Sequence, residues 1–332
     1  MKQDFELLMS LMTEPALCVR EGKIKSFNAA AAAALPKLRA GARASAFLPQ
    51  HILSGESDGW SAAAMVGGRV CDITAARSGG ALIIVLRTPP AESGEGEDTE
   101  LLSALQSTLG NCHMAIEMMF NNIDEQALSP GVRKYASILL HSHYLMQRSV
   151  GHLMLERADM PPRTGACCNL PEICSDVVTT ASLLLRETCV TPDYSTELGT
   201  LLVQLDGELA ERVLLALIAE SVKRMPRGGA LKITLTADEA ARLTLRGEPC
   251  GECDKSDGEG TAFAKAAIVR SGGTVLTETL PAGFAVTLSL PLASGSEAPM
   301  KEPCNAPSRS MAPVLTELSP VLGSESYLLE YL

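Results

Sequence analysis

A glycine-rich stretch that opens a predicted helix is the clearest candidate for binding chemistry in this sequence. It runs Gly258-Glu259-Gly260-Thr261, and the residues after it predict a helix over 261–271. Backbone N–H groups at the start of a helix point toward an anion such as a phosphate, and glycines let the anion approach closely. The same glycines can also form a simple turn, so both interpretations stay open.

Ten cysteines and five histidines raise the question of a metal site. Cys250 and Cys253 form a single C-x-x-C pair, and Cys167 and Cys168 are adjacent. A zinc site needs a second pair of ligands at suitable spacing, and none of the histidines supplies one. We therefore expect no bound metal, and reduced thiols that serve mainly as small apolar side chains.

The formal net charge of −11 limits the partners of the chain. An acidic protein is repelled by the phosphates of nucleic acids, so we expect no binding to DNA or RNA. No stretch approaches the roughly 18 consecutive apolar residues of a membrane span. The N-terminus carries acidic residues and is a poor signal peptide. These features predict a cytoplasmic protein without a membrane span.

Residues 1–88 combine short predicted strands with short helices, and the chain as a whole is long enough for two or three domains. Asn28 is placed to cap a helix over 29–35, which Pro36 ends. Pro89 to Glu100 is rich in Pro, Gly, Ser, Glu and Asp, which predicts a linker. The expected strands cover 16–19, 24–27, 60–66, 69–74 and 81–87.

Residues 101–160 predict two long helices joined by a turn at Ser129-Pro130-Gly131. The first helix carries an apolar seam with alternating spacings of three and four residues. A single hairpin leaves part of this seam exposed to water, so we expect two copies to form a four-helix bundle. The seam consists of Leu102, Leu105, Leu109, Cys112, Ile116, Met119 and Ile123.

Residues 169–292 mix helices and strands in an order that predicts helices on one face of a mainly antiparallel sheet. The tail at 293–332 is of low complexity and is expected to be mostly disordered, with a short docking helix near its end, where apolar residues return over 315–332. The predicted helices of the mixed segment are 171–187, 206–223 and 261–271, and its strands are 198–205, 230–237, 242–246, 274–280 and 284–290.

The order of these segments resembles a bacterial sensor histidine kinase. Such a protein joins a PAS-like sensor, a dimerisation and phosphotransfer hairpin, and an α/β sandwich of the gyrase, Hsp90 and histidine-kinase ATPase type. The resemblance is carried by an N-box-like helix at 212–223 with its turn at 226–231, a glycine-rich box at 258–269, and a closing hairpin at 271–275 and 282–291. It implies an α+β multidomain fold and a homodimer through the hairpin. It also implies a response regulator or a partner kinase as binding partner.

The position that accepts the phosphoryl group in this family is changed. The family has a histidine two residues before a core leucine of the first hairpin helix, and the seam through Leu105 and Leu109 places Ser103 there. A serine hydroxyl needs a general base to act as a nucleophile, and no base is adjacent. His113 lies ten residues farther along the helix, and we interpret it as a structural histidine.

The nucleotide-binding positions are changed as well. The N-box asparagines, one of which binds Mg²⁺, correspond to Ala216 and Glu220, and no aspartate for adenine stands in 245–251, where Glu248 is a weak substitute. The lid is reduced to about 252–257. The resemblance implies ATP with Mg²⁺ as the cofactor, and these changes argue against it. The remaining candidates for cofactor binding are Glu220, Lys223, Gly258, Gly260 and Thr261.

Three hypotheses follow. The first is a pseudokinase that acts as a scaffold in two-component signalling, because the phosphate acceptor, N-box, adenine aspartate and lid have all departed from the family pattern. The second is a divergent, active ATP-dependent histidine kinase, supported by the retained Lys223, Gly258 and Gly260. The third is a PAS-based small-molecule or redox sensor that uses Cys18 or Cys71.

Overall fold

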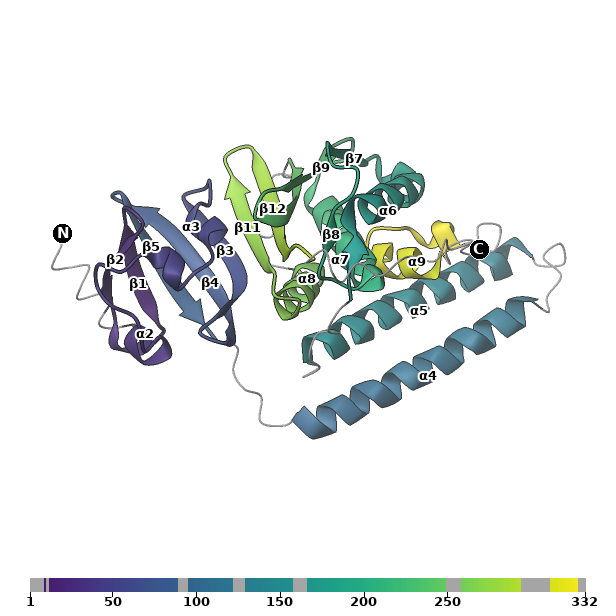
Figure 1. The fold of residues 1–332 in the computed structure, drawn as a ribbon. Helices are drawn as coiled ribbons and strands as arrows, with labels where there is room; N and C mark the ends of the chain where they lie inside the picture. The colour runs from purple at the N-terminus through teal and green to yellow at the C-terminus, as the bar shows by residue number, and fades with distance from the viewer. Residues whose placement is uncertain are drawn as a thin grey trace.

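A ten-stranded sheet runs through the molecule and joins its two halves (Figure 1). The computed structural model describes residues 9, 12–88, 95–121, 129–157, 166–248, 258–293 and 311–327. The strands of the sheet are β1 (Ala16–Arg20), β2 (Lys23–Phe27), β3 (Gly59–Val66), β4 (Arg69–Ser78), β5 (Ala81–Arg87), β7 (Thr191–Thr196), β9 (Ala230–Ala237), β10 (Ala240–Gly247), β11 (Thr274–Leu280) and β12 (Gly283–Pro291). Their order is β2-β1-β5-β4-β3-β11-β12-β10-β9-β7, and only β7 and β9 pair in parallel.

The helices gather into a hairpin, a layer on the second half of the sheet, and a short C-terminal element (Figure 1). The hairpin helices are α4 (Glu95–Asn121) and α5 (Pro130–Arg157), the layer contains α6 (Leu170–Leu184), α7 (Gly207–Arg224) and α8 (Glu259–Arg270), and the C-terminal element contains α9 (Ala312–Leu318) and η4 (Ser324–Tyr327). Smaller elements are α2 (Ala29–Ala34), η1 (Ala44–Ala46), α3 (Gln50–Leu53) and η3 (Leu185–Thr188), with β6 (Cys168–Asn169) and β8 (Leu202–Val203) as a separate pair.

Asn28 organises the start of the first half, as its position before an alanine run predicts. Its side-chain oxygen accepts hydrogen bonds from the N–H of Ala31 at 2.9 Å and of Ala16 at 3.0 Å. The amide nitrogen donates to the carbonyls of Met12 and Glu14. One buried side chain therefore caps α2 and ties it to β1, and the five strands expected in this half are all found.

The hairpin begins earlier than the sequence predicts. Helix α4 starts at Glu95, inside the stretch 89–100 that the composition assigns to a linker. Acidic residues favour the positive end of the helix dipole, so Glu95 and Glu97 suit a helix start despite the adjacent glycines. Helix α5 lies between α4 and the helices of the sandwich (Figure 1). Among the described residues, no helix has the length and apolar character needed to cross a bilayer.

Two predictions in the second half need correction. The strand expected at 198–205 is reduced to β8, because Gly199 interrupts it and Asp206 already caps α7. Strand β7 was not predicted from the sequence, since Thr-Pro-Asp-Tyr-Ser-Thr has no apolar alternation. It is an edge strand, where a proline such as Pro192 is tolerated and the pairing is set by β9.

The two halves meet where β3 pairs with β11. Leu276 of β11 is buried in the apolar core of the first half. The carboxylate of Glu278 on β11 accepts hydrogen bonds from the backbone N–H of Glu56 at 2.6 Å and of Ser57 at 3.2 Å. Residues more than 200 positions apart are therefore fixed in one register.

Candidate functional site

Helices α7 and α8 bring most of the predicted site residues together. Asp206 caps α7 by accepting from the N–H groups of Glu208 and Leu209, and the apolar residues that follow bury the helix. Glu220 near the C-terminal end of α7 lies against Gly258, the N-cap residue of α8. The predicted glycine-rich box and N-box helix are thus neighbours in space.

The glycines at the start of α8 are needed for packing within the chain. A side chain on Gly258 would overlap the Glu220 carboxylate. A Cβ on Gly260 would lie 2.8 Å from the backbone oxygen of Ala216 and 3.1 Å from Nη2 of Arg148. Neither glycine has a positive φ, so close approach by neighbours, and not a special backbone conformation, explains both.

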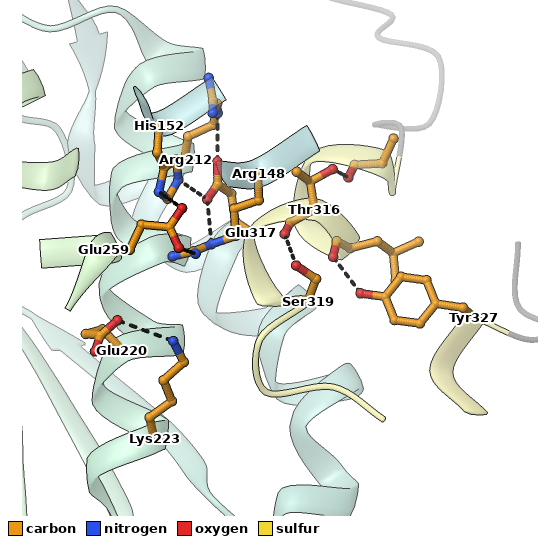
Figure 2. A network of polar contacts seen from close by, with 12 residues as sticks. Arg148, His152, Arg212, Glu220, Lys223, Glu259, Thr316, Glu317, Ser319 and Tyr327 are labelled. Atoms are coloured by element: carbon orange, nitrogen blue, oxygen red, sulfur yellow. Dashed lines mark hydrogen bonds and ion pairs between the residues drawn. The ribbon is translucent and has the colours of Figure 1, made fainter. Parts of the chain in front are cut away.

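The other predicted residues differ in burial. Glu220 is 8 % exposed and carries a carboxylate whose Oε2 lies 3.6 Å from Nζ of Lys223, which is an ion pair longer than a hydrogen bond (Figure 2). Thr261 is buried, and its Oγ1 has no hydrogen-bond partner within the described part of the chain. Glu248, the substitute for the adenine aspartate, is exposed.

Ser103 stands apart from this group. Its side chain is exposed on α4, the outer hairpin helix. Helix α4 packs on α5, which lies between it and the helices of the sandwich (Figure 1). His113, the nearest alternative on α4, stacks on His143 of α5 with ring centroids 5.2 Å apart, which fits a structural role.

A network of charged side chains covers the start of α8 (Figure 2). Arg148 of α5 is 1 % exposed, and its Nη1 donates to Oε2 of Glu259 at 2.8 Å. His152, one turn farther along α5, is fully buried between Glu317 of α9, whose Oε2 is 2.7 Å from Nε2, and Glu259, whose Oε1 is 3.7 Å from Nδ1. Arg212 of α7 donates from Nε to Oε1 of Glu317 at 2.8 Å. Four helices therefore share one polar cluster.

Glu317 is the centre of this cluster. It is completely buried, and burial alone would raise its pKa, because a carboxylate loses its hydration. The hydrogen bond and charge of His152, together with Arg212, outweigh burial and hold the pKa of Glu317 below its usual value. Glu317 is therefore expected to be ionised and paired at neutral pH.

Sequence reasoning missed the cluster. One signal was available, because His141, Tyr144, Arg148 and His152 follow each other at spacings of three, four and four residues and so lie on one face of α5. Such a polar and aromatic stripe is unusual on a helix that packs against a core. Nothing in the sequence pointed to its partner, Glu317, which comes 165 residues after His152.

The predicted cysteine chemistry is disfavoured in the described residues. Cys18 and Cys71 are both buried in the first half, and burial raises the pKa of each thiol. A thiol that stays protonated is a poor nucleophile and a poor redox sensor. Cys250 and Cys253, together with the reduced lid at 252–257, lie outside the described residues.

No family model and no curated protein matches this sequence. Among solved structures, the histidine kinase ThkA in complex with the response regulator TrrA shares 16 % identity, covers 87 % of this chain and 98 % of its own, and has a TM-score of 0.39. AdeS, a histidine kinase of Acinetobacter baumannii, shares 16 % identity, covers 58 % of this chain and 98 % of its own, and has a TM-score of 0.41.

A third similar structure is full-length ShkA in complex with AMPPNP. It shares 19 % identity, covers 59 % of this chain and 44 % of its own, and has a TM-score of 0.44. At these identities and TM-scores, the similarity carries no argument about activity.

One side chain at the site disfavours ATP with Mg²⁺. Glu220 lies against Gly258, and Arg148 lies against Gly260, at the start of α8. The Glu220 carboxylate would repel a triphosphate at this point. At the end of β10, a Cβ on Gly247 would lie 2.8 Å from the Phe284 ring and 2.9 Å from the Met225 sulfur, so a larger side chain does not fit at this position.

Proposed function

We propose that this chain is a non-catalytic relative of sensor histidine kinases that acts as a scaffold in two-component signalling. The observation that carries the proposal is the Glu220 carboxylate beside Gly258, which puts a negative charge at the start of α8, where the family's glycine-rich box would meet a phosphate. The exposed Ser103 supports it, because a hydroxyl without an adjacent base cannot replace the phosphate-accepting imidazole.

In this proposal the parts keep the roles that the resemblance implies. Residues 1–88 form a PAS-like sensor, supported by the strand order β2-β1-β5-β4-β3 with short helices between β2 and β3. Residues 101–160 form the hairpin, residues 169–292 the ATPase-like sandwich, and residues 293–332 the tail. The pairing of β3 with β11 would let a change in the sensor reach the sandwich directly.

The proposed assembly is a homodimer through the hairpin. In the seam of α4, Leu105 and Met119 are 43 % and 44 % exposed. Helix α5 adds a second exposed apolar stripe, formed by Val132, Tyr135, Leu139, Met146 and Leu153. Two copies that pack these stripes together would form a four-helix bundle. The partner of this dimer would be a response regulator or an active kinase.

Incubation with ATP radiolabelled at the γ-phosphate tests the proposal. The wild-type protein should acquire no acid-labile label, and Ser103→His should not acquire it either, because restoring the acceptor does not restore nucleotide binding. An active histidine kinase serves as the positive control. Acid-labile label on any histidine of the wild-type chain would instead support the hypothesis of a divergent active kinase.

A further inference from the structure

The C-terminal element, defined here as residues 311–327 with α9 and η4, lies against the hairpin and the sandwich at once. Helix α9 has seven residues. A helix this short is not stable alone in water, because the cost of nucleation is not recovered over so few hydrogen bonds. It is therefore helical only while docked, so docking and folding of this element are one transition.

Apolar and aromatic contacts hold the element against α5 and α7. Val314, Leu315 and Leu318 are buried, and Tyr327 closes the element by donating a hydrogen bond from its hydroxyl to the Leu315 carbonyl at 2.7 Å. The Tyr327 ring stacks on His141 of α5 with centroids 5.1 Å apart. These contacts use the same face of α5 that carries Arg148 and His152.

The charged groups at this interface come from different elements, so they separate from one another when α9 undocks. Arg148, His152 and Arg212 belong to α5 and α7, whereas the buried carboxylate of Glu317 arrives with α9 (Figure 2). Burying charged groups is expensive, and the pairing only offsets that expense. Undocking would return Glu317 to water and leave Arg148 and His152 paired with Glu259 of α8. An interface of this composition is suited to reversible docking.

We propose that the C-terminal element is an intramolecular latch with Glu317 as its anchor. When docked, it fixes α5 on α7 and α8 and holds the hairpin against the sandwich. When released, it bares a basic and aromatic face made by His141, Tyr144, Arg148, His152 and Arg212. This inference does not depend on the proposed function, because it concerns contacts that exist whether or not a nucleotide binds.

Amide hydrogen exchange on the full-length protein tests the latch. Glu317→Gln removes the anchoring charge and keeps the shape, whereas Glu325→Gln makes the same change at an exposed position of the same element. Glu317→Gln should speed exchange in 312–327 by about tenfold or more, and also speed exchange in 141–156 and 259–263. Strands β9 and β10 should exchange as in the wild type. Glu325→Gln should change nothing.

A second variant covers the case in which Glu317→Gln fails to fold. Tyr327→Phe removes only the hydrogen bond to Leu315 and should speed exchange in 312–327 about threefold, with the sheet unchanged. The latch is refuted if neither variant alters exchange in the element. It is equally refuted if exchange rises uniformly through the sheet, since the element would then be part of a single core.

Discussion

At the scale of single residues, the two glycines at the start of α8 differ in the atoms that an added Cβ would contact. A Cβ on Gly260 would meet a backbone oxygen of Ala216, which cannot move without distorting α7. A Cβ on Gly258 would meet only the end of the Glu220 side chain, which can rotate away. The glycines are thus explained by packing, and their presence alone is no evidence for phosphate binding.

We predict that Gly260→Ala lowers the free energy of unfolding by about 2 kcal/mol and that Gly258→Ala lowers it by about 1 kcal/mol. Gly110→Ala on α4 is the matched control. It has open space around its Cα, so it should be neutral or stabilise the helix by about 0.5–1 kcal/mol. Denaturation by urea measures all three. Equal effects at 258 and 260 would contradict the packing assigned to Ala216.

Glu317 makes the free energy of unfolding depend on pH. Its pKa is lower in the folded protein than the ordinary value of 4.5, so its ionised form stabilises the fold above that pH, and the contribution is lost as pH falls through the lowered pKa. Glu317→Gln should cost about 3 kcal/mol at pH 7, because Arg212 loses its ion pair and Arg148 and His152 keep only Glu259. The difference in stability between wild type and variant should shrink below pH 4.5. A difference independent of pH would show that Glu317 is not ionised.

At the scale of elements, the junction of β3 and β11 also contains a titrating group. His51 of α3 forms a hydrogen bond between Nε2 and the Thr274 hydroxyl at the start of β11. Burial, with a smaller effect of the charge on Arg242, lowers the pKa of His51 to about 4. The junction therefore favours the neutral imidazole.

Between pH 6.5 and 4 the unfolded chain binds a proton at His51 that the folded chain does not, so stability should fall as pH falls through this range. We expect a loss of about 2 kcal/mol, below the full value of the pKa shift because the side chain is only partly buried. Thermal unfolding at several pH values, with His51→Gln as the control that lacks this proton, measures the effect. Parallel curves for the two proteins would contradict it.

The elements were predicted well where local chemistry decides them. Asn28 before the alanine run and Asp206 before the apolar helix are caps visible in the sequence, and both helices begin where expected. Strand β7 was missed because its pairing with β9, and not its own pattern, makes it a strand. The early start of α4 was missed because glycines and acidic residues also occur in linkers.

The site was only partly predictable for the same reason. Local sequence patterns alone predicted four of the candidate binding residues, and these lie close together in the structure: Glu220, Gly258, Gly260 and Thr261. Arg148 and Glu317 could not be chosen, because their meaning depends on a contact between segments far apart in the sequence. Local patterns indicate which residues could bind an anion, but only tertiary structure shows which side chains from distant segments pack beside them.

At the scale of the whole molecule, the exposed seam of the hairpin predicts the oligomeric state. Leu105→Glu should weaken the proposed dimer at least tenfold, because it places a charge in the apolar contact. Ala104→Glu, on the neighbouring residue outside the seam, introduces the same side chain and should leave the dimer intact. Sedimentation velocity over a range of concentrations measures both. A wild-type protein that remains monomeric throughout would contradict the assembly.

The central claim of the proposal is that the chain does not bind nucleotide, because the Glu220 carboxylate beside Gly258 disfavours a phosphate at the start of α8. Calorimetric titration of the wild-type protein with Mg-ATP tests this most directly. We expect no saturable heat up to about 1 mM nucleotide, which corresponds to less than about 4 kcal/mol of binding free energy. Saturable binding with a micromolar dissociation constant would contradict the assignment of the chain as a pseudokinase.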